Sequence, residues 1–403
     1  MDQFFADLGR TVFARWKAEN FSLPAFPEIA RRALEERPPS EHVDLSELVH
    51  DFLRDDAQPF QTQSGFGQPE IVVYDDPRFY IQLLFWLDGT TDIHQHEFSG
   101  AFHVLAGSSI HSLFAFEKAQ SVTPHLRVGR LRMTKTELLE TGRTLPIVSG
   151  RDYIHSLFHL DTPSVTVVVR TQTDVGTGPQ FTYLPPHIAV DPVHADALTM
   201  RRKQLIDVME KTEDPAYAGL VIEMLADLDF ERGFFVLQNV ANCLQSLGDW
   251  EDAWKVFRKK HGKLADYVAP TLTEIARRDG ISAMRSSITE VEHRFFLALL
   301  LNVPNRDDIL GMVAQRFPGK PIETILRWAA ELAEISDEGA WLLDAQFPPE
   351  LDVDLDEQPA MLLSALRVSL GGGKVAGLSA ARLKALRAAL VRSSWSALIS
   401  PKV

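Results

Sequence analysis

The hydrophobic pattern of the sequence changes its period twice, and this constrains the fold more than any other feature. Residues 4–16, 27–37 and 44–55 carry apolar side chains at a spacing of three to four, which is typical of packed helices. Residues 70–186 consist of short runs rich in Val, Ile, Phe and Thr, separated by Gly, Asp and Pro as in antiparallel sheets. Helical periodicity then returns and continues along the C-terminal half of the sequence.

This pattern predicts an α+β protein in three parts. We expect an N-terminal helical segment at residues 1–60, an antiparallel β-barrel domain at 61–192, and an all-α helical domain at 193–403. A chain of 403 residues exceeds the usual size of one hydrophobic core, which agrees with more than one domain. Hydrophobic residues make up 45% and charged residues 24%, the proportions of a folded globular protein.

The charge and the apolar runs exclude two classes of partner. The formal net charge of -14 provides no broad cationic surface, so neither nucleic acid nor an anionic membrane is expected as a partner. The longest apolar runs are far shorter than the roughly 20 residues that a membrane-spanning helix needs. Small molecules or proteins remain as partners.

Cysteine usage and the N-terminal residues point to the cytoplasm. Cys243 is the only cysteine, which forbids an internal disulfide and every thiolate-rich zinc or iron–sulfur site. The first sixteen residues resemble an amphipathic helix and lack the order of charged and apolar regions that a signal peptide has. We therefore expect a protein of the reducing cytoplasm.

A cluster of histidines in the β-rich region predicts a metal site. His94 and His96 are two residues apart, so on an extended strand both side chains point to the same face. Gly89 precedes them and Gly107 ends the next strand, which predicts a hairpin with two inward imidazoles. His155 supplies a third imidazole from another strand-like run. Three neutral imidazoles suit a divalent first-row ion with open coordination positions.

Around these histidines the sequence resembles the cupin superfamily. That family has a glycine, then HxH, then an acid, then a second glycine, with a further histidine in a later motif. Here Gly100 stands in the place of the acid, which leaves three histidines and no carboxylate. Over about residues 70–186 the sequence looks most like the cysteine dioxygenase-type thiol dioxygenases, three-histidine iron cupins. The similar stretches are "FWLDGTTDIHQHEFSGAF", "LAGSSIHSLFAFE" and "IHSLFHLDTPSVTVVV". This resemblance implies Fe(II) as the cofactor.

Several positions depart from that family. The family's cysteine in the hairpin strand corresponds to Gly100, so a cysteine–tyrosine thioether cannot form. Its Ser, His and Tyr relay falls on Thr166, Val168 and Arg170, and most of the relay is therefore lost. Its substrate-clamping arginine corresponds to a segment in which Arg78 occupies an expected turn. The resemblance therefore does not carry over the identity of the substrate.

Two further residues are candidates for catalytic roles. If the strand alternates from Thr166, the guanidinium of Arg170 faces the cavity and could pair bidentately with a substrate carboxylate. His159 is four residues beyond His155, on the same strand face, where it would support the ligands or provide a fourth nitrogen. We expect His103 and His111 to point away from the barrel interior. Apolar residues such as Phe102, Leu113 and Phe158 are expected to keep bulk water out. 

Three functions remain open at this point. The first is a mononuclear non-haem iron oxygenase that activates O2 to oxidise a small, carrier-bound or peptide-bound anionic substrate. The second is a ligand-sensing or scaffold protein, in which the barrel binds a small molecule with or without a metal and the helical domain binds a peptide or protein partner. A barrel that has lost its metal would keep the histidines as polar lining. The third is a cupin that uses zinc, nickel or manganese for isomerisation or hydrolysis.

Overall fold

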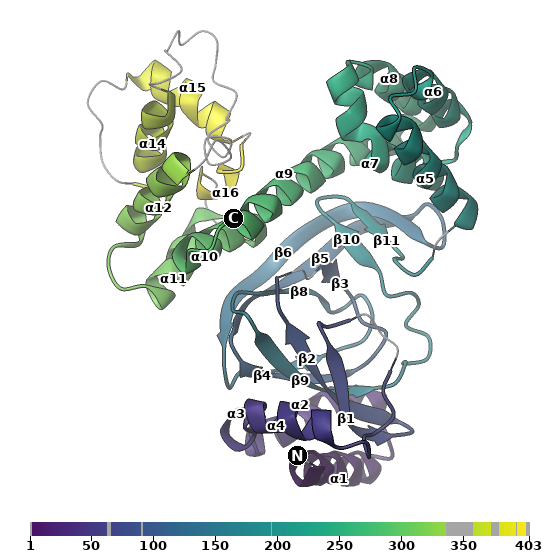
Figure 1. The fold of residues 1–403 in the computed structure, drawn as a ribbon, viewed down its shortest axis with the longest axis vertical. Helices are drawn as coiled ribbons and strands as arrows, with labels where there is room; N and C mark the ends of the chain where they lie inside the picture. Colours follow the sequence, from purple (N-terminus) through teal and green to yellow (C-terminus); the bar gives the residue numbers. More distant parts are fainter. Residues whose placement is uncertain are drawn as a thin grey trace.

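The helices and strands follow the three zones of the sequence (Figure 1). The structure, a computed structural model, describes residues 2–62, 66–89, 92–194, 196–335, 358–371, 379–391 and 393–399. The α-helices described before the first strand are α1 (Asp2–Ala18), α2 (Phe26–Glu36), α3 (Pro39–His42) and α4 (Leu45–Arg54). The first three helical runs of the sequence therefore form α1, α2 and α4.

The strands form a sheet and a closed barrel, and all of their pairings are antiparallel. The five-stranded sheet has the order β1-β2-β9-β4-β7, and the six-stranded barrel has the order β10-β11-β6-β5-β8-β3. The predicted α+β class with an antiparallel barrel is thus confirmed. The sheet strands are β1 (Glu70–Asp76), β2 (Phe79–Trp86), β4 (Gly100–Ala106), β7 (Thr144–Ile147) and β9 (Ser164–Thr171). The barrel strands are β3 (Ile93–His94), β5 (Ser108–Ser121), β6 (Leu126–Glu140), β8 (Ile154–His159), β10 (Thr182–Leu184) and β11 (Ile188–Val190).

The hairpin expected around the two neighbouring histidines is wrong. Strand β3, which carries His94, pairs with β8 and β10, whereas the next strand, β4, pairs with β7 and β9. His96 lies in the connection between them. The turn at Gly107, which has a φ of +81°, then returns the chain from β4 to β5 in the barrel. Strands that are neighbours in sequence therefore lie in different sheets, which a pattern of alternating residues cannot reveal.

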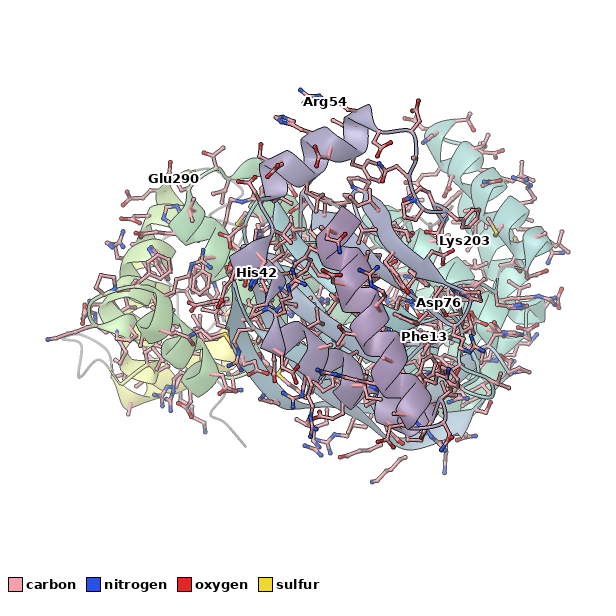
Figure 2. All side chains as sticks on the ribbon, turned by 90° about the horizontal axis from the view of Figure 1, so that it is seen from below. Phe13, His42, Arg54, Asp76, Lys203 and Glu290 are labelled. Atoms are coloured by element: carbon pink, nitrogen blue, oxygen red, sulfur yellow. The ribbon has the colours of Figure 1, made fainter. Side chains whose placement is uncertain are left out.

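The N-terminal helices cover the outer face of the five-stranded sheet. Figure 2 shows α1, marked by Phe13, lying across these strands. Trp16 of α1 and Phe26 of α2 pack against Phe79 of β2, with ring centroids 6.3 and 5.8 Å away. Leu83 of β2 is fully buried in the same core. Its neighbour Leu84 faces the opposite side, toward the histidines, because side chains alternate along a strand.

The C-terminal half is helical throughout its described part. In Figure 1, α9 runs along the barrel and connects one group of helices with the other. None of the described helices combines the length and apolar character needed to cross a bilayer. The helices are α5 (Ala197–Lys211), α6 (Tyr217–Asp227), α7 (Phe230–Leu247), α8 (Trp250–His261), α9 (Val268–Ser287), α10 (Val291–Asn302), α11 (Arg306–Arg316), α12 (Pro321–Ile335), α14 (Gln358–Ser369), α15 (Ala380–Leu390) and α16 (Ser396–Ile399).

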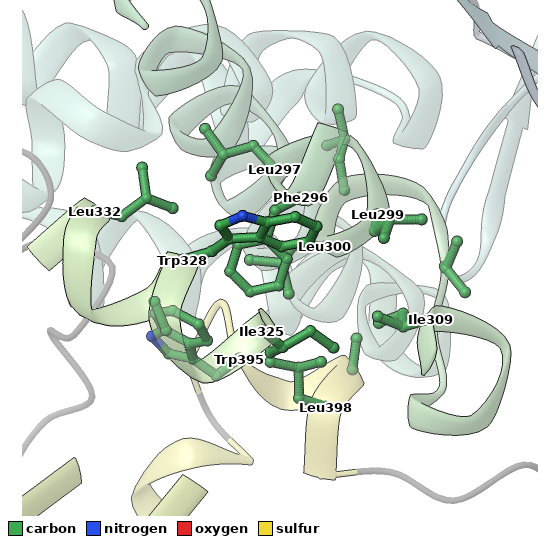
Figure 3. Packing of buried hydrophobic residues seen from close by; sticks show 14 of the residues in the cluster. Phe296, Leu297, Leu299, Leu300, Ile309, Ile325, Trp328, Leu332, Trp395 and Leu398 are labelled. Atoms are coloured by element: carbon green, nitrogen blue, oxygen red, sulfur yellow. The ribbon is translucent and has the colours of Figure 1, made fainter. Parts of the chain in front are cut away.

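The core of α10–α16 extends onto the outer face of the barrel. At its centre the fully buried ring of Trp328 lies 5.7 Å from that of Phe296 (Figure 3). Phe158 of β8 belongs to this core, so the expectation that it shields the histidines is wrong. Arg316 of α11 joins the two parts by donating hydrogen bonds of 2.7 Å to the Ser108 hydroxyl and 3.0 Å to the Asp161 carboxylate.

We expect Trp328→Ala to destabilise the protein by about 3–5 kcal/mol, because it removes a large side chain from a filled core. Guanidinium unfolding followed by circular dichroism measures this. The control is Leu205→Ala on α5, where the side chain is 63% exposed and the expected change lies within about 0.5 kcal/mol. Equal shifts in the two unfolding midpoints would contradict the packing described here.

Candidate metal centre

Three histidine side chains meet at the inner wall of the barrel. His94 of β3 pairs directly with His155 of β8, and His96 lies just after β3. One nitrogen from each ring lies within 4.8 Å of those from the other two rings. All three residues are only 4–6% exposed. The structure therefore brings together the three residues that the sequence predicted as metal ligands.

Contacts at Nδ1 orient two of the three rings, those of His94 and His155. The Nδ1 atom of His94 lies 2.8 Å from the Asp92 carbonyl oxygen, so Nδ1 carries the proton and Nε2 keeps its lone pair. The Nε2 atoms of His96 and His155 are 2.8 Å apart. The Nε2 atom of His94 is buried and has no hydrogen-bond partner among the described residues. A buried nitrogen in this state indicates a missing binding partner.

The interior keeps the three imidazoles neutral. Burial lowers the pKa of His94, and it lowers the pKa of both His96 and His155 well below the usual range for histidine. The other histidines of the cluster lower the pKa of His96 and His155 further, because a second positive charge nearby is unfavourable. Neutral imidazole is the form that binds a metal ion.

The distance between two of the nitrogens is compatible with a shared metal ion. Ligand bonds of about 2.0–2.1 Å place two nitrogens on one ion roughly 2.9–3.4 Å apart, depending on octahedral or tetrahedral geometry. The distance of 2.8 Å between the Nε2 atoms of His96 and His155 is close to this range. Those two atoms could instead share an N–H···N hydrogen bond, as in a barrel without metal. That alternative leaves Nε2 of His94 without a partner among the described residues.

The expectation that His111 points away from the interior is wrong. His111 is 2% exposed, and its Nε2 atom lies 3.3 Å from Nδ1 of His155. Its Nδ1 atom lies 3.4 Å from the Glu137 carboxylate, and the hydrogen bond with His111 lowers the pKa of Glu137 to about 2. His111 faces inward because its register partner on β8 is Leu157, a cavity residue. Such outer contacts orient the rings of metal-binding histidines.

A small apolar cavity adjoins the three histidines. Its volume is about 40 Å³, which is space for roughly three water-sized groups. Phe102 lines this cavity, as expected, whereas Leu113 does not. Thr166 and Val168, at two positions of the family's relay, also line it. The other apolar lining residues include Leu84, Trp86, Phe98, Ile147 and Leu157.

His159 faces the same cavity but lies outside the group of three. Its ring stacks on Trp86 with centroids 4.6 Å apart, and its Nδ1 atom lies 3.0 Å from the Ser109 hydroxyl. Burial lowers the pKa of His159 to about 3, so the ring is neutral. Its Nε2 atom is buried without a partner among the described residues. His159 therefore offers a polar atom to the cavity and is not part of the cluster that could hold an ion.

Arg170 lies beside the cavity and does not line it. Its guanidinium lies 3.4 Å from the ring centroid of Phe98, which separates it from the histidines. It also donates hydrogen bonds of 3.3 Å to the carbonyl oxygens of Thr171 and Gln172. Its charge lowers the pKa of His96, after the larger effects of burial and of His94. A role in binding a substrate carboxylate stays a prediction.

His103 and Arg78 lie away from the cavity. His103 is fully buried beneath the N-terminal helices, with Nε2 2.9 Å from the Ser40 hydroxyl and Nδ1 2.8 Å from that of Thr144. This agrees with the expectation that it points away from the interior. Arg78 occupies the turn between β1 and β2, where its guanidinium lies 4.6 Å from the ring centroid of Phe21.

The close approach of two strands explains why position 100 carries neither the cupin acid nor the cysteine of the thiol dioxygenases. A Cβ atom on Gly100 would lie 2.1 Å from the carbonyl oxygen of Val169 on β9. No side chain fits at this distance without a backbone shift. Among the described residues, the group that could hold a metal accordingly contains no carboxylate.

Comparison with known proteins leaves the function open. No family model matches the chain, and no curated protein matches it. Solved structures similar to it include a Klebsiella pneumoniae protein with a double-stranded β-helix domain, at 13% identity and a TM-score of 0.20, covering 29% of this chain and 87% of that one. A Thermus thermophilus protein is 19% identical with a TM-score of 0.20, and the match covers 32% of this chain and 96% of that one. A DMSP lyase from Ruegeria pomeroyi is 15% identical with a TM-score of 0.24, and the match covers 44% of this chain and 95% of that one. Likenesses of this strength carry no activity to this chain.

We expect Gly100→Ala to destabilise the protein by about 1–3 kcal/mol, because the new methyl group collides with the backbone of β9. Thermal unfolding of the variant measures the effect. The matched control is Gly219→Ala in α6, where a Cβ atom meets nothing within 4 Å and the better helix propensity of alanine favours a small gain. An unchanged melting temperature for Gly100→Ala would be inconsistent with the strand spacing.

We expect His111→Leu to weaken metal binding about 10- to 100-fold, because His155 loses the contact that orients its ring. Titration with Co(II) in competition with a chromophoric chelator measures the affinity. His103→Leu removes an equally buried histidine that faces away from the cavity, and this control should bind Co(II) as the unmodified protein does. Equal affinities for both variants would remove the role assigned to His111.

Proposed function

We propose that the protein is a mononuclear non-haem iron oxygenase that activates O2 at His94, His96 and His155 to oxidise an anionic substrate. The observation that supports this most strongly is the convergence of three neutral, buried imidazoles without a carboxylate, beside a cavity. The sequence resemblance to thiol dioxygenases points to the same iron chemistry, without carrying over the identity of the substrate.

The charge of the ligand set favours an anionic substrate. A ferrous ion held by three neutral imidazoles keeps its full positive charge, binds donors such as a thiolate, and supplies the electrons that reduce dioxygen. The main-chain carbonyl oxygen of Asp92 orients the ring of His94, and the side chain of His111 orients that of His155. The apolar walls exclude bulk water, which would otherwise compete with the substrate and react with intermediates.

The size of the cavity limits what can reach the histidines. A space of about 40 Å³ admits a very small molecule, or only the reacting end of a larger one. Phe66, which is 36% exposed, lies at this cavity with its ring 6.0 Å from that of His94. A substrate joined to a carrier or a peptide would therefore insert only its terminal donor group.

We assign auxiliary roles to His159 and Arg170 on the same reading. The Nδ1 atom of His159 is hydrogen-bonded to Ser109, and its Nε2 atom is buried without a partner among the described residues. Nε2 can therefore donate or accept a hydrogen bond to the bound substrate. Arg170, whose charge lowers the pKa of His96, would attract the carboxylate or other negative charge of a substrate.

The decisive experiment is elemental analysis of anaerobically purified protein, combined with oxygen-electrode assays on a panel of small thiols. We expect close to one iron per chain and oxygen uptake that depends on the thiol. His155→Ala should lose both the iron and the uptake, whereas His103→Leu, which keeps all three ligands, should retain them. Circular dichroism establishes that the two variants remain folded.

Other results would select another function. Zinc, nickel or manganese in the purified protein without oxygen uptake would replace the oxygenase with a hydrolase or isomerase at the same three histidines. A protein that takes up no metal at all, yet binds a small molecule or a protein, would leave the ligand-sensing or scaffold function. Retention of iron by His155→Ala would refute the ligand assignment itself.

A further inference from the structure

A second and much larger cavity lies between the barrel and the C-terminal helices. Its volume is about 500 Å³, within the range of roughly 300–1,000 Å³ that is typical of ligand sites. Phe114 and Leu131 from the barrel and Val303 after α10 contribute apolar lining. The histidine cavity shares none of its lining residues. Figure 1 shows α9 crossing the barrel next to this position.

Two arginines of α9 line this larger cavity, and only one of them forms an ion pair with a described carboxylate. Arg277 forms two hydrogen bonds of 2.7 Å with the carboxylate of Glu274, which compensates its charge. Arg278 donates a hydrogen bond of 2.9 Å to the Leu301 carbonyl oxygen at the end of α10 and makes no ion pair with a described carboxylate. Burial of this guanidinium lowers the pKa of Arg278, although the charges of Glu274, Asp92 and Asp279 act in the opposite direction.

A partly buried guanidinium that has no carboxylate in direct contact, beside an apolar space, is a recognisable binding feature. A guanidinium presents five N–H donors, and the Leu301 carbonyl accepts from only one nitrogen of Arg278. The remaining donors suit a carboxylate or phosphate group, which arginine binds bidentately. Ser156, whose residue is 3% exposed, adds a hydroxyl group to the same lining.

We propose that this cavity binds an amphipathic organic anion, whose charged group pairs with Arg278 and whose apolar body lies against Phe114 and Leu131. The proposal does not depend on the metal or on the oxygenase chemistry. Capping of α10 by Arg278 explains its hydrogen bond to Leu301, but it explains neither the remaining N–H donors nor the adjoining space.

The position of the cavity suggests how a ligand bound in it would affect the histidines. Ile93 and Ser156 line the larger cavity, while the residues next to them in sequence, His94 and His155, face the histidine cavity. The two sites therefore lie on opposite faces of the same pair of strands. An anion bound here contacts the outer side of the wall that carries two of the three histidines, without access to their nitrogens.

Isothermal titration of the full-length protein with octanoate, octyl phosphate and 1-octanol tests the proposal. We expect saturable binding of about one anion per chain, and binding of 1-octanol at least about tenfold weaker, since it lacks the charge. The stronger of the two anions identifies whether the natural headgroup is of the carboxylate or the phosphate type. Arg278→Met should weaken anion binding about tenfold or more.

Matched variants make the result decisive. Arg258→Met removes an arginine on α8 whose side chain is 64% exposed, and it should leave binding unchanged. His155→Ala should also retain binding, which separates this site from the metal centre. Thr273→Phe fills the cavity from its exposed side on α9 and should abolish binding while Arg278 is kept.

Three results would overturn the proposal. They are the absence of saturable anion binding up to about 1 mM, binding of 1-octanol as tight as that of octanoate, and unchanged binding by a folded Arg278→Met protein. If Arg278→Met does not fold, Thr273→Phe decides, because undiminished anion binding by that variant would place the ligand elsewhere.

Discussion

The pairing of His94 with His155 across β3 and β8 is the contact on which the candidate metal centre depends. β3 has only two residues, and β8 on one side and β10 on the other hold it in place. A shift of one residue in this register would turn His94 away from the cavity, because side chains alternate along a strand. Burial then keeps the converging rings neutral, and the Asp92 carbonyl selects the nitrogen that faces inward.

Strands β3 and β8 each contribute side chains to two sites or cores at once. Along β8, His155 faces the histidine cavity, whereas Phe158 faces the core of the helical half. Arg285 of α9 lies 5.0 Å from the Phe158 ring centroid and donates a 2.9 Å hydrogen bond to Asp88, in the segment that leads to β3. The helical half therefore packs against the outer side of β3 and β8, which carry His94 and His155. It also supplies Arg277 and Arg278 to the larger cavity.

The sequence was informative wherever a property depends on local spacing. The hydrophobic period located the helices and the strands, and the HxH spacing together with His155 identified three residues that do meet. The sequence-based prediction failed where the partner strand decides toward which face a side chain points. His111 was expected to face outward, yet its register opposite Leu157 turns it toward His155. The expected hairpin failed for a related reason, since successive strands enter different sheets. The inward face of β5 could have been found only by knowing that it pairs with β8.

The sequence by itself determined which types of side chain are present, which segments are strands or helices, and that neither a cysteine nor an acid occupies position 100. Tertiary structure decided the rest, because the remaining properties depend on contacts between distant segments. The backbone of β9 leaves no room for a side chain at Gly100, the Phe98 ring separates Arg170 from the histidines, and the packing of α9 against the barrel places Arg278 beside a large cavity. No spacing within one segment contains that information.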